Sequence, residues 1–270
     1  MVTASVHINL GLTVMDSLFA ALRLVRCEAA LLLALSASSP FLDGAATGAH
    51  SQRWLQFPLT PARVPLFTGH GHYIEWMGEQ LAAGTMRNVR HLWTSVRPNG
   101  EDRPHDLNRL EIRICDLISD PLVLLAVAAF AELRVHQLLA DPDRHDPLRA
   151  SRLDAEELAV LADANDRAVA RGSLEAELRH WRDGAPIQAR EWIWSDLETM
   201  AEPAAALGLT ETLQPLRTVL REGNQAMRWL SRQRKGDPIG MILGSEATAM
   251  GEQELSLEAW LASDPAYALG

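Results

Sequence analysis

The chain has 270 residues, 47% hydrophobic and 22% charged, which is the composition of a globular protein with one large domain or two small ones. Its formal net charge of −10 arises mostly in residues 136–270, which hold 23 acidic and 14 basic side chains, so no basic face is offered to nucleic acid or to a membrane. Lys235 is the one lysine, and no G-x-x-x-x-G-K-[ST] motif is present, so the chain has no P-loop. Any phosphate would have to be bound by arginine and a metal.

The first predicted element is a strand over 3–11, because its apolar and polar residues alternate with a period of two. His7 and Asn9 share one face of this strand, and the apolar residues share the other. A helix is expected over 17–35. It is apolar on nearly all sides and should therefore lie inside the fold.

Residues 36–44 break that helix, and prolines keep the chain loop-like up to about residue 68. A helix over 73–83 follows. Residues 91–97 then alternate like a strand and end at the turn signal Pro98-Asn99-Gly100.

The next strand, 108–116, places Glu111, Arg113 and Cys115 on one face, opposite Leu110, Ile112 and Ile114. We expect it to pair antiparallel with the strand at 91–97, which would bring Arg97 and Glu111 near one end of a sheet. The rest of the chain is predicted to be helical, near 121–139, 154–170, 173–182, 187–206, 210–234 and 256–262. The predicted fold class is therefore α+β, as a single domain over 1–270. Residues 1–140 would form its sheet and active-site part, and residues 141–270 an acidic helical part.

The two cysteines have no C-x-x-C spacing, so both are expected to be buried thiols. No basic signal-peptide start precedes Arg23, and the uncharged run 29–42 is too short to cross a bilayer. We therefore expect a cytoplasmic protein that has neither nucleic acid nor a membrane as a partner.

A carboxylate, a guanidinium, an imidazole and an amide on inner strand faces can hold a metal and an anionic substrate. The same residue types have a simpler interpretation. Glu111 and Arg113 can form a structural ion pair, and His7 and Asn9 can satisfy each other on the sheet. Residue type and spacing alone leave both interpretations open.

Seven phrases, taken together and in this order, raise the odds of a functional site. The set resembles glutamate–cysteine ligase, in the cyanobacterial-type branch of the bacterial ligases that also includes the carboxylate–amine ligases. The phrases are SVHINLG at 5–11, LSASSPF at 35–41, HSQR at 50–53, LWTSVRP at 92–98, LEIRICD at 110–116, NDRAVAR at 165–171 and REGNQAMRWL at 221–230.

This resemblance implies a fold related to glutamine synthetase, with a curved antiparallel sheet whose concave face carries the site and with helices on its back. It implies that ATP phosphorylates the side-chain carboxylate of glutamate and that the amine of cysteine attacks the acyl phosphate. The products would be γ-glutamylcysteine, ADP and phosphate, in the first step of glutathione synthesis. Mg²⁺ and arginine clamps would neutralise the charge of the transferred phosphoryl group.

The resemblance also assigns roles to residues. Glu111 matches a strand glutamate that ligates Mg²⁺, and Arg113 an arginine that contacts glutamate or phosphate. His7 matches a histidine at the metal and phosphate site, with Asn9 beside it. Arg53 matches an arginine expected to hold the α-carboxylate of glutamate, and Arg97 one expected to touch phosphate; Arg171, in the sixth phrase, is a secondary match.

Family members have a further segment of roughly a hundred residues in front, less than one typical domain, which supplies other Mg²⁺ ligands. This chain begins at Met1-Val2-Thr3, so we expect an N-terminally incomplete domain, through either a misplaced gene start or a true truncation. Two alternatives stay open. One is ligation of glutamate to another amine. The other is a non-catalytic remnant that binds glutamate or nucleotide and forms a homodimer through its open sheet edge.

Overall fold

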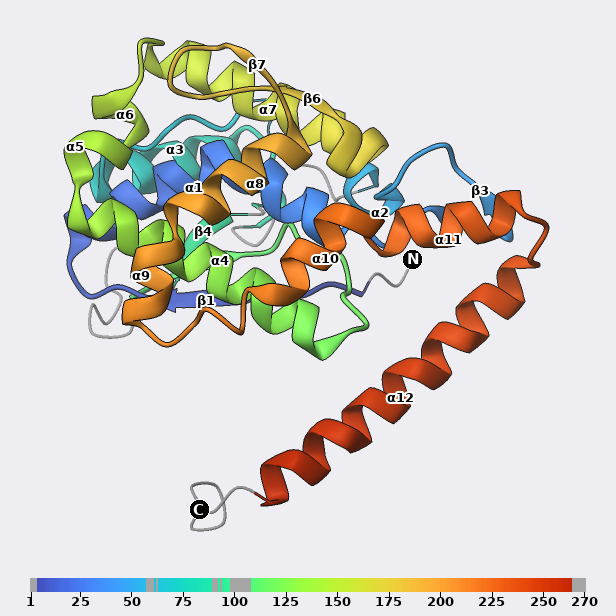
Figure 1. Ribbon diagram of the computed structural model, residues 1–270. Helices are drawn as coiled ribbons and strands as arrows, with labels where there is room; N and C mark the ends of the chain where they lie inside the picture. The colour runs from blue at the N-terminus through green and yellow to red at the C-terminus, as the bar shows by residue number, and fades with distance from the viewer. Residues whose placement is uncertain are drawn as a thin grey trace.

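A computed structural model describes residues 4–56, 61, 63–88, 92, 94–97 and 108–263 (Figure 1). The predicted α+β class is confirmed, because one three-stranded antiparallel sheet is combined with a largely helical C-terminal half. The N-terminal half contains β1 Ile8–Gly11, α1 Met15–Ser36, β2 Phe41–Leu42, β3 Ala45–Ala46, α2 Gln52–Leu55, α3 His70–Ala82, β4 Thr94–Arg97 and β5 Arg109–Ile112.

The helix α1 is the centre of the molecule. Every residue from Leu18 to Ser36 is buried, as expected for a helix that is apolar on all sides. It packs against β4 and β5 on one side, and against α4 (Pro121–Ala140) and α7 (Ala155–Gly172) elsewhere on its surface. One hydrophobic cluster around α1 extends from Ile8 to Leu220, so both halves of the chain contribute to the same core.

The strand order is β1-β5-β4, with both pairs antiparallel. The predicted pairing of the strand near 91–97 with the Glu111 strand is confirmed, and the register places Arg97 opposite Arg109 and Ser95 opposite Glu111. Leu110 and Ile112 are fully buried toward α1, whereas the alternate residues of β5 are only half-buried. The sheet thus has a core face and an outer face, as the alternation of residue types predicts.

Four buried ion pairs, made by three arginines, join α1 to distant parts of the chain. Arg23 donates to Asp146 through Nε at 2.9 Å and through an Nη at 2.5 Å, and Arg26 donates to Asp163 and to Asp166. Arg134 of α4 donates to Glu28 at 2.6 and 2.8 Å. Removing one partner of such a pair leaves a buried charge uncompensated, which costs about 3–5 kcal/mol. These contacts therefore make the arrangement around α1 specific.

The helical half also contains α5 Pro142–His145, α6 Pro147–Ala150, α8 Ala189–Thr199, α9 Ala201–Ala206, α10 Gln214–Glu222, α11 Gln225–Arg234 and α12 Ile239–Ser263. By length and composition α4 could cross a membrane, but half of its most apolar window is buried inside the protein. Its contacts with α1 are those of a core helix in a globular fold. In Figure 1, α12 extends away from the rest of the molecule.

The prediction of a helix over 173–182 is wrong. The chain forms a short 3-10 turn at Ser173–Glu175 and then a hairpin of β6 (Glu177–Arg179) and β7 (Pro186–Gln188). Gly184 in the connection has a φ of +74°. A left-handed residue followed by a proline ends a helix and favours a turn.

The boundaries of the other predicted helices in this half also change. The helix predicted over 187–206 begins after β7 and is divided into α8 and α9, and the one over 210–234 is divided at Gly223 into α10 and α11. The helix predicted over 256–262 is the end of a much longer helix that begins at Ile239. In the loop after α1, β2 and β3 form a small hairpin with left-handed φ angles at Asp43 and Gly44.

Candidate functional site

The strand register assembles the predicted residues in rows on the outer face of the sheet. Asn9, Glu111 and Ser95 lie directly opposite one another, and so do Gly11, Arg109 and Arg97. Directly opposite residues of antiparallel strands share a face, so both rows lie on the face that points away from α1. The sequence predicted the pairing that brings Arg97 close to Glu111, and the structure adds the pairing of β1 with β5 that brings Asn9 beside Glu111.

Glu111 is at the centre of this face. One of its carboxylate oxygens accepts a hydrogen bond from Ser95 Oγ at 3.4 Å, and the other lies 4.0 Å from His7 Nδ1. The Glu111 side chain is 14% exposed and that of His7 is 40% exposed. The carboxylate is therefore supported by the neighbouring strands and is still open to solvent on one side.

His7 and Arg113 meet just beyond β1 and β5. Arg113 Nε donates to His7 Nε2 at 3.5 Å, and Ser5 Oγ lies 3.3 Å from the same ring nitrogen. The predicted proximity of His7, Glu111 and Arg113 is thus present in the structure. An imidazole and a guanidinium beside one carboxylate form a polar cluster that can bind an anion on the cationic side.

The alternation of faces ends at Arg113. Ser5 pairs with Asp116 in an isolated bridge, whereas Ile8 pairs with Ile112, so three residue steps on one strand match four on the other. An extra residue of this kind makes a bulge, and it turns Cys115 into the core, where it is fully buried. Burial raises the pKa of the Cys115 thiol to about 12, so this side chain is a neutral core residue rather than a nucleophile.

Asn9 and Arg53 have protein partners. Asn9 Oδ1 accepts a hydrogen bond from Arg109 Nε at 2.9 Å. The Arg53 side chain is buried, and its guanidinium donates to the carbonyl oxygens of Arg113 at 2.8 Å and Ile114 at 3.0 Å. Both side chains thus support the sheet, and their predicted contacts with substrate stay predictions.

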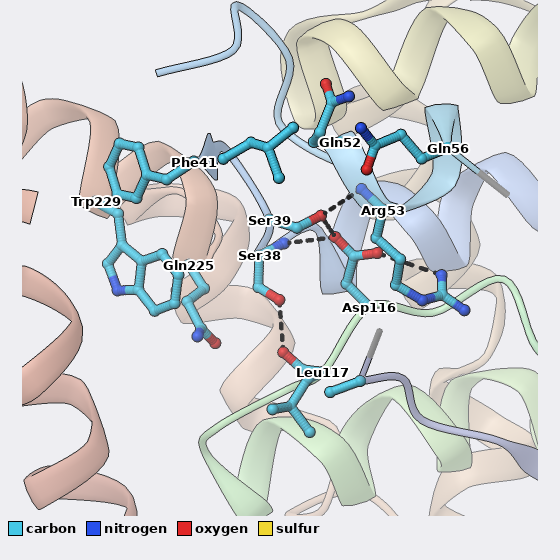
Figure 2. A pocket seen from close by; sticks show the side chains of 12 residues that line it. Ser38, Ser39, Phe41, Gln52, Arg53, Gln56, Asp116, Leu117, Gln225 and Trp229 are labelled. Atoms are coloured by element: carbon cyan, nitrogen blue, oxygen red, sulfur yellow. Dashed lines mark hydrogen bonds and ion pairs between the residues drawn. The ribbon is translucent and has the colours of Figure 1, made fainter. Parts of the chain in front are cut away.

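Asp116 was not singled out as a site residue by the sequence, yet it organises the region beside the sheet (Figure 2). Its carboxylate accepts hydrogen bonds from the backbone of Ser38 at 3.0 Å and from Ser39 Oγ at 2.7 Å. It also accepts one from Ser51 Oγ at 2.9 Å. Arg53 completes this set at 3.4 Å. The partners lie 63 to 78 positions away in sequence, so no local pattern could have revealed them.

A pocket of about 250 Å³ opens next to this network (Figure 2). Phe41 and Trp229 stack at one side with ring centroids 6.3 Å apart, and Gln52 and Gln56 lie at the other side. Ligand pockets for larger molecules span about 300–1,000 Å³, so this one suits an amino acid better than a whole nucleotide. It lies beside the sheet end where Asp116 pairs with Ser5.

The fit of Mg²⁺ to this face depends on Glu111. Mg²⁺ takes oxygen ligands and is often held by one or two carboxylates together with phosphate oxygens and water. Within the described residues, no group of three or more His, Cys, Asp or Glu side chains could form a metal site alone. Glu111 thus fits a site in which Mg²⁺ is held by a carboxylate together with phosphate oxygens. His7 was expected to contact both the metal and phosphate, and its imidazole suits contact with phosphate better than ligation of Mg²⁺.

A family model described as glutamate-cysteine ligase family 2 matches residues 1–253. The chain belongs to this family. The resemblance inferred from the seven phrases is therefore confirmed.

Curated relatives of the same family are provisionally named glutamate–cysteine ligase 2. A protein of Leifsonia xyli is 30% identical over 228 residues, covering 84% of this chain and 57% of the relative. Proteins of Sorangium cellulosum and of the cyanobacterium Gloeobacter violaceus are each 28% identical over 229 residues; these matches cover 83% and 82% of this chain, and 58% and 57% of the relatives. The chain thus spans less than two thirds of the length of these relatives.

Two solved structures share the fold. The glutamate–cysteine ligase of Francisella tularensis, determined in complex with AMP, superposes with a TM-score of 0.55 at 14% identity, covering 93% of this chain and 65% of that one. A bifunctional glutathione synthetase from Pasteurella multocida gives a TM-score of 0.57 at 16% identity over 87% of this chain and 32% of that one. At such identities the likeness concerns the fold alone.

Proposed function

We propose that this chain performs ATP-dependent ligation of the side-chain carboxylate of L-glutamate to the amine of L-cysteine. The product would be γ-glutamylcysteine, the first intermediate of glutathione synthesis, made by way of γ-glutamyl phosphate. The observation that carries the proposal is the meeting of His7, Glu111 and Arg113 on one open sheet face in a member of glutamate–cysteine ligase family 2.

In this proposal each group on the face has one task. Glu111 supplies a carboxylate oxygen to Mg²⁺, which when bound neutralises phosphate charge. Arg113 and Arg97 stabilise the phosphoryl group during its transfer, because guanidinium groups bind phosphate oxygens in pairs. His7 lies beside Glu111 at 4.0 Å, where its ring faces the same phosphate.

The pocket of about 250 Å³ is the proposed amino-acid subsite. Arg53 forms part of its lining and contributes positive charge, although its terminal nitrogens donate to protein oxygens. We therefore propose that Arg53 attracts the α-carboxylate of glutamate through its charge, with the amides of Gln52 and Gln56 as direct contacts.

The deciding experiment is release of phosphate from ATP by the purified chain with Mg²⁺. We expect release only when glutamate and cysteine are both present, and a γ-glutamylcysteine product by mass spectrometry. Equal turnover with other amines would show that cysteine is not the specific acceptor. An absence of turnover with every amine would contradict ligation.

Two variants test the assigned residues. Arg113→Ala should lower kcat by about a hundredfold or more with an unchanged circular dichroism spectrum, because a preorganised donor to the transferred group is lost. Glu111→Gln should mainly raise the KM for Mg²⁺·ATP. Normal turnover in Arg113→Ala would show that the site is assigned wrongly.

A second candidate is binding of glutamate or nucleotide without turnover. Glu111 is the single carboxylate on the outer rows that the described strands form. Two Mg²⁺ ions would need more oxygen ligands than this, which favours binding without catalysis. Calorimetry with glutamate and with ATP, set beside the phosphate-release assay, separates the two candidates. A cytoplasmic location and a homodimer are further parts of the proposal, and sedimentation velocity tests the latter.

A further inference from the structure

Arg109 is an arginine on the outer face to which neither the sequence phrases nor the proposed reaction gives a role. It begins β5 and lies directly opposite Gly11 of β1 and Arg97 of β4. Its Nε donates to Asn9 Oδ1 at 2.9 Å. Because Nε is engaged, the two terminal nitrogens of the guanidinium are held in a fixed direction and are not used by Asn9.

Among the residues that the structure describes, the charges around Arg109 are mostly positive. Like charges that lie directly opposite on neighbouring strands destabilise a sheet, and here two arginine positions, 97 and 109, are paired in the register. In the described part of the chain no carboxylate lies within ion-pair distance of Arg109, and Glu111 is already close to His7 and Ser95. The two outer rows thus hold two arginine positions, 97 and 109, and one acidic residue, Glu111.

A multivalent anion removes this repulsion. Phosphate is suited to it, because a guanidinium presents a planar pair of donors that matches two phosphate oxygens. A chain of phosphates also has the length to contact successive positions along a strand face, where residues two apart are about 7 Å from each other.

We propose that Arg109 binds the polyphosphate of the nucleotide, together with Arg97, and that Asn9 is a positioning residue that orients Arg109. This deepens the proposed function, on which the identity of the anion as ATP rests. It also changes the expected role of Asn9, from a contact with substrate to a contact with the arginine that binds it. Arg113 and His7 then face the far end of the same anion.

The test is calorimetric binding of inorganic triphosphate, without glutamate or cysteine, to the full chain and to four variants. We expect Arg109→Gln to weaken binding about tenfold to a hundredfold, since charge-assisted hydrogen bonds are lost. Arg109→Lys should recover part of the affinity, because it restores charge but not the fork. Asn9→Ala should weaken binding by a smaller factor. The salt dependence of binding should stay unchanged, because this variant keeps the positive charge of Arg109.

Arg152→Gln is the matched control, because this arginine is exposed and lies in the loop before α7, away from the sheet. It should bind triphosphate like the unaltered chain. Affinities of Arg109→Gln equal to those of the control, or no binding of triphosphate by the unaltered chain, would overturn the proposal. The chain could also bind triphosphate through Arg109 and yet ligate no amine. That result would support the role of Arg109 and overturn the proposed ligation.

Discussion

Arg53 shows how one buried side chain can hold the fold together at the edge of a pocket. Its guanidinium joins the helix α2 to the end of the sheet through two carbonyl oxygens and Asp116. The side chain is 7% exposed, so its charge is compensated inside the protein. Its position beside the pocket follows from this network, and any effect of Arg53 on substrate therefore depends on the same contacts.

Replacement of Arg53 by alanine should lower the free energy of unfolding by about 3–5 kcal/mol, because Asp116 and two carbonyl groups lose a buried cationic donor. Urea unfolding followed by tryptophan fluorescence measures this. Arg152→Ala, at an exposed arginine, should change stability by less than about 0.5 kcal/mol. If both variants unfold at the same urea concentration, Arg53 does not have the structural role described here.

Asp196 makes the stability depend on pH. It is buried beside Arg134 and Glu28, and burial raises its pKa to about 7 despite the attraction of Arg134. Its Oδ2 lies 3.7 Å from Arg134 Nε and has no hydrogen-bond donor. In the unfolded chain this carboxyl group ionises near its ordinary value of about 3.9.

The native state therefore holds a proton on Asp196 that the unfolded state releases, and its contribution to stability is lost as the pH rises from about 4 to about 7. Asp196→Asn should remove this slope. We expect the variant to gain stability relative to the unaltered chain between pH 5 and pH 8, by about 1.4 kcal/mol for each unit of pKa difference. His145, whose pKa burial lowers to about 4, destabilises both proteins alike on acidification, so the difference between them isolates Asp196. A difference that does not change with pH would contradict this assignment.

At the scale of elements, Gly223 decides where α10 ends and α11 begins. It has a φ of +96°, and a Cβ there would lie 3.1 Å from Met227 Cβ. The next residue, Asn224, caps α11 by accepting from the backbone of Met227, and its Nδ2 donates to the carbonyl of Ala34 at 2.7 Å. The break thus holds α11 against the end of α1, next to Phe41 and Trp229 of the pocket.

Gly223→Ala should destabilise the protein by about 1–2 kcal/mol, through its left-handed backbone and the crowding of Met227. Gly244→Ala is the matched control, since Gly244 lies inside α12 with open space where the Cβ would be. There alanine should be neutral or stabilising by up to about 1 kcal/mol, because glycine is a poor helix former. Thermal unfolding of both variants by circular dichroism measures the difference. An equal change in the two would show that the conformation of Gly223 is not required.

The elements that sequence could predict are long apolar runs and segments with a strong period. Helices α1 and α4 were recognised as long apolar runs, and the strand around Glu111 by its period-two alternation. The hairpins β2–β3 and β6–β7 have only two or three residues per strand, too few for a period to develop. They are held instead by turn residues with left-handed φ angles, such as Gly44 and Gly184, and by contacts with the rest of the fold.

At the scale of the whole molecule, the outer face of the sheet was predictable and the surroundings of Asp116 were not. The period-two alternation assigned Glu111 to its strand face, and the predicted pairing of 91–97 with 108–116 brought Arg97 near it, whereas the pairing of β1 with β5 came from the structure. The hydrogen bonds to Asp116 and Arg53 join segments some 60 to 80 residues apart, and they depend on how the loop after α1 folds back. The contacts of Arg53 were missed for that reason.

The helix α12 should contribute unequally along its length to the stability of the molecule. Near its start Ile242 is fully buried, and Glu246 accepts hydrogen bonds from Ser119 and Trp229. Beyond Thr248 the described side chains are mostly exposed, and Leu122 of α4, which faces this part of α12 across a groove, is itself 57% exposed.

A chain that ends at Thr248 should therefore keep its free energy of unfolding within about 1 kcal/mol. A chain that ends at Lys235 should lose about 2 kcal/mol or more, because the burial of Ile242 alone is worth about 1.5–3 kcal/mol. Urea unfolding of the two truncated chains and the full chain measures both losses. Brief proteolysis should cut within 249–263 before it cuts any other described helix, because few contacts there oppose local unfolding. The chain that ends at Thr248 could instead lose as much stability as the chain that ends at Lys235. In that case residues 249–263 must make buried contacts with the rest of the protein in solution, which would contradict this prediction.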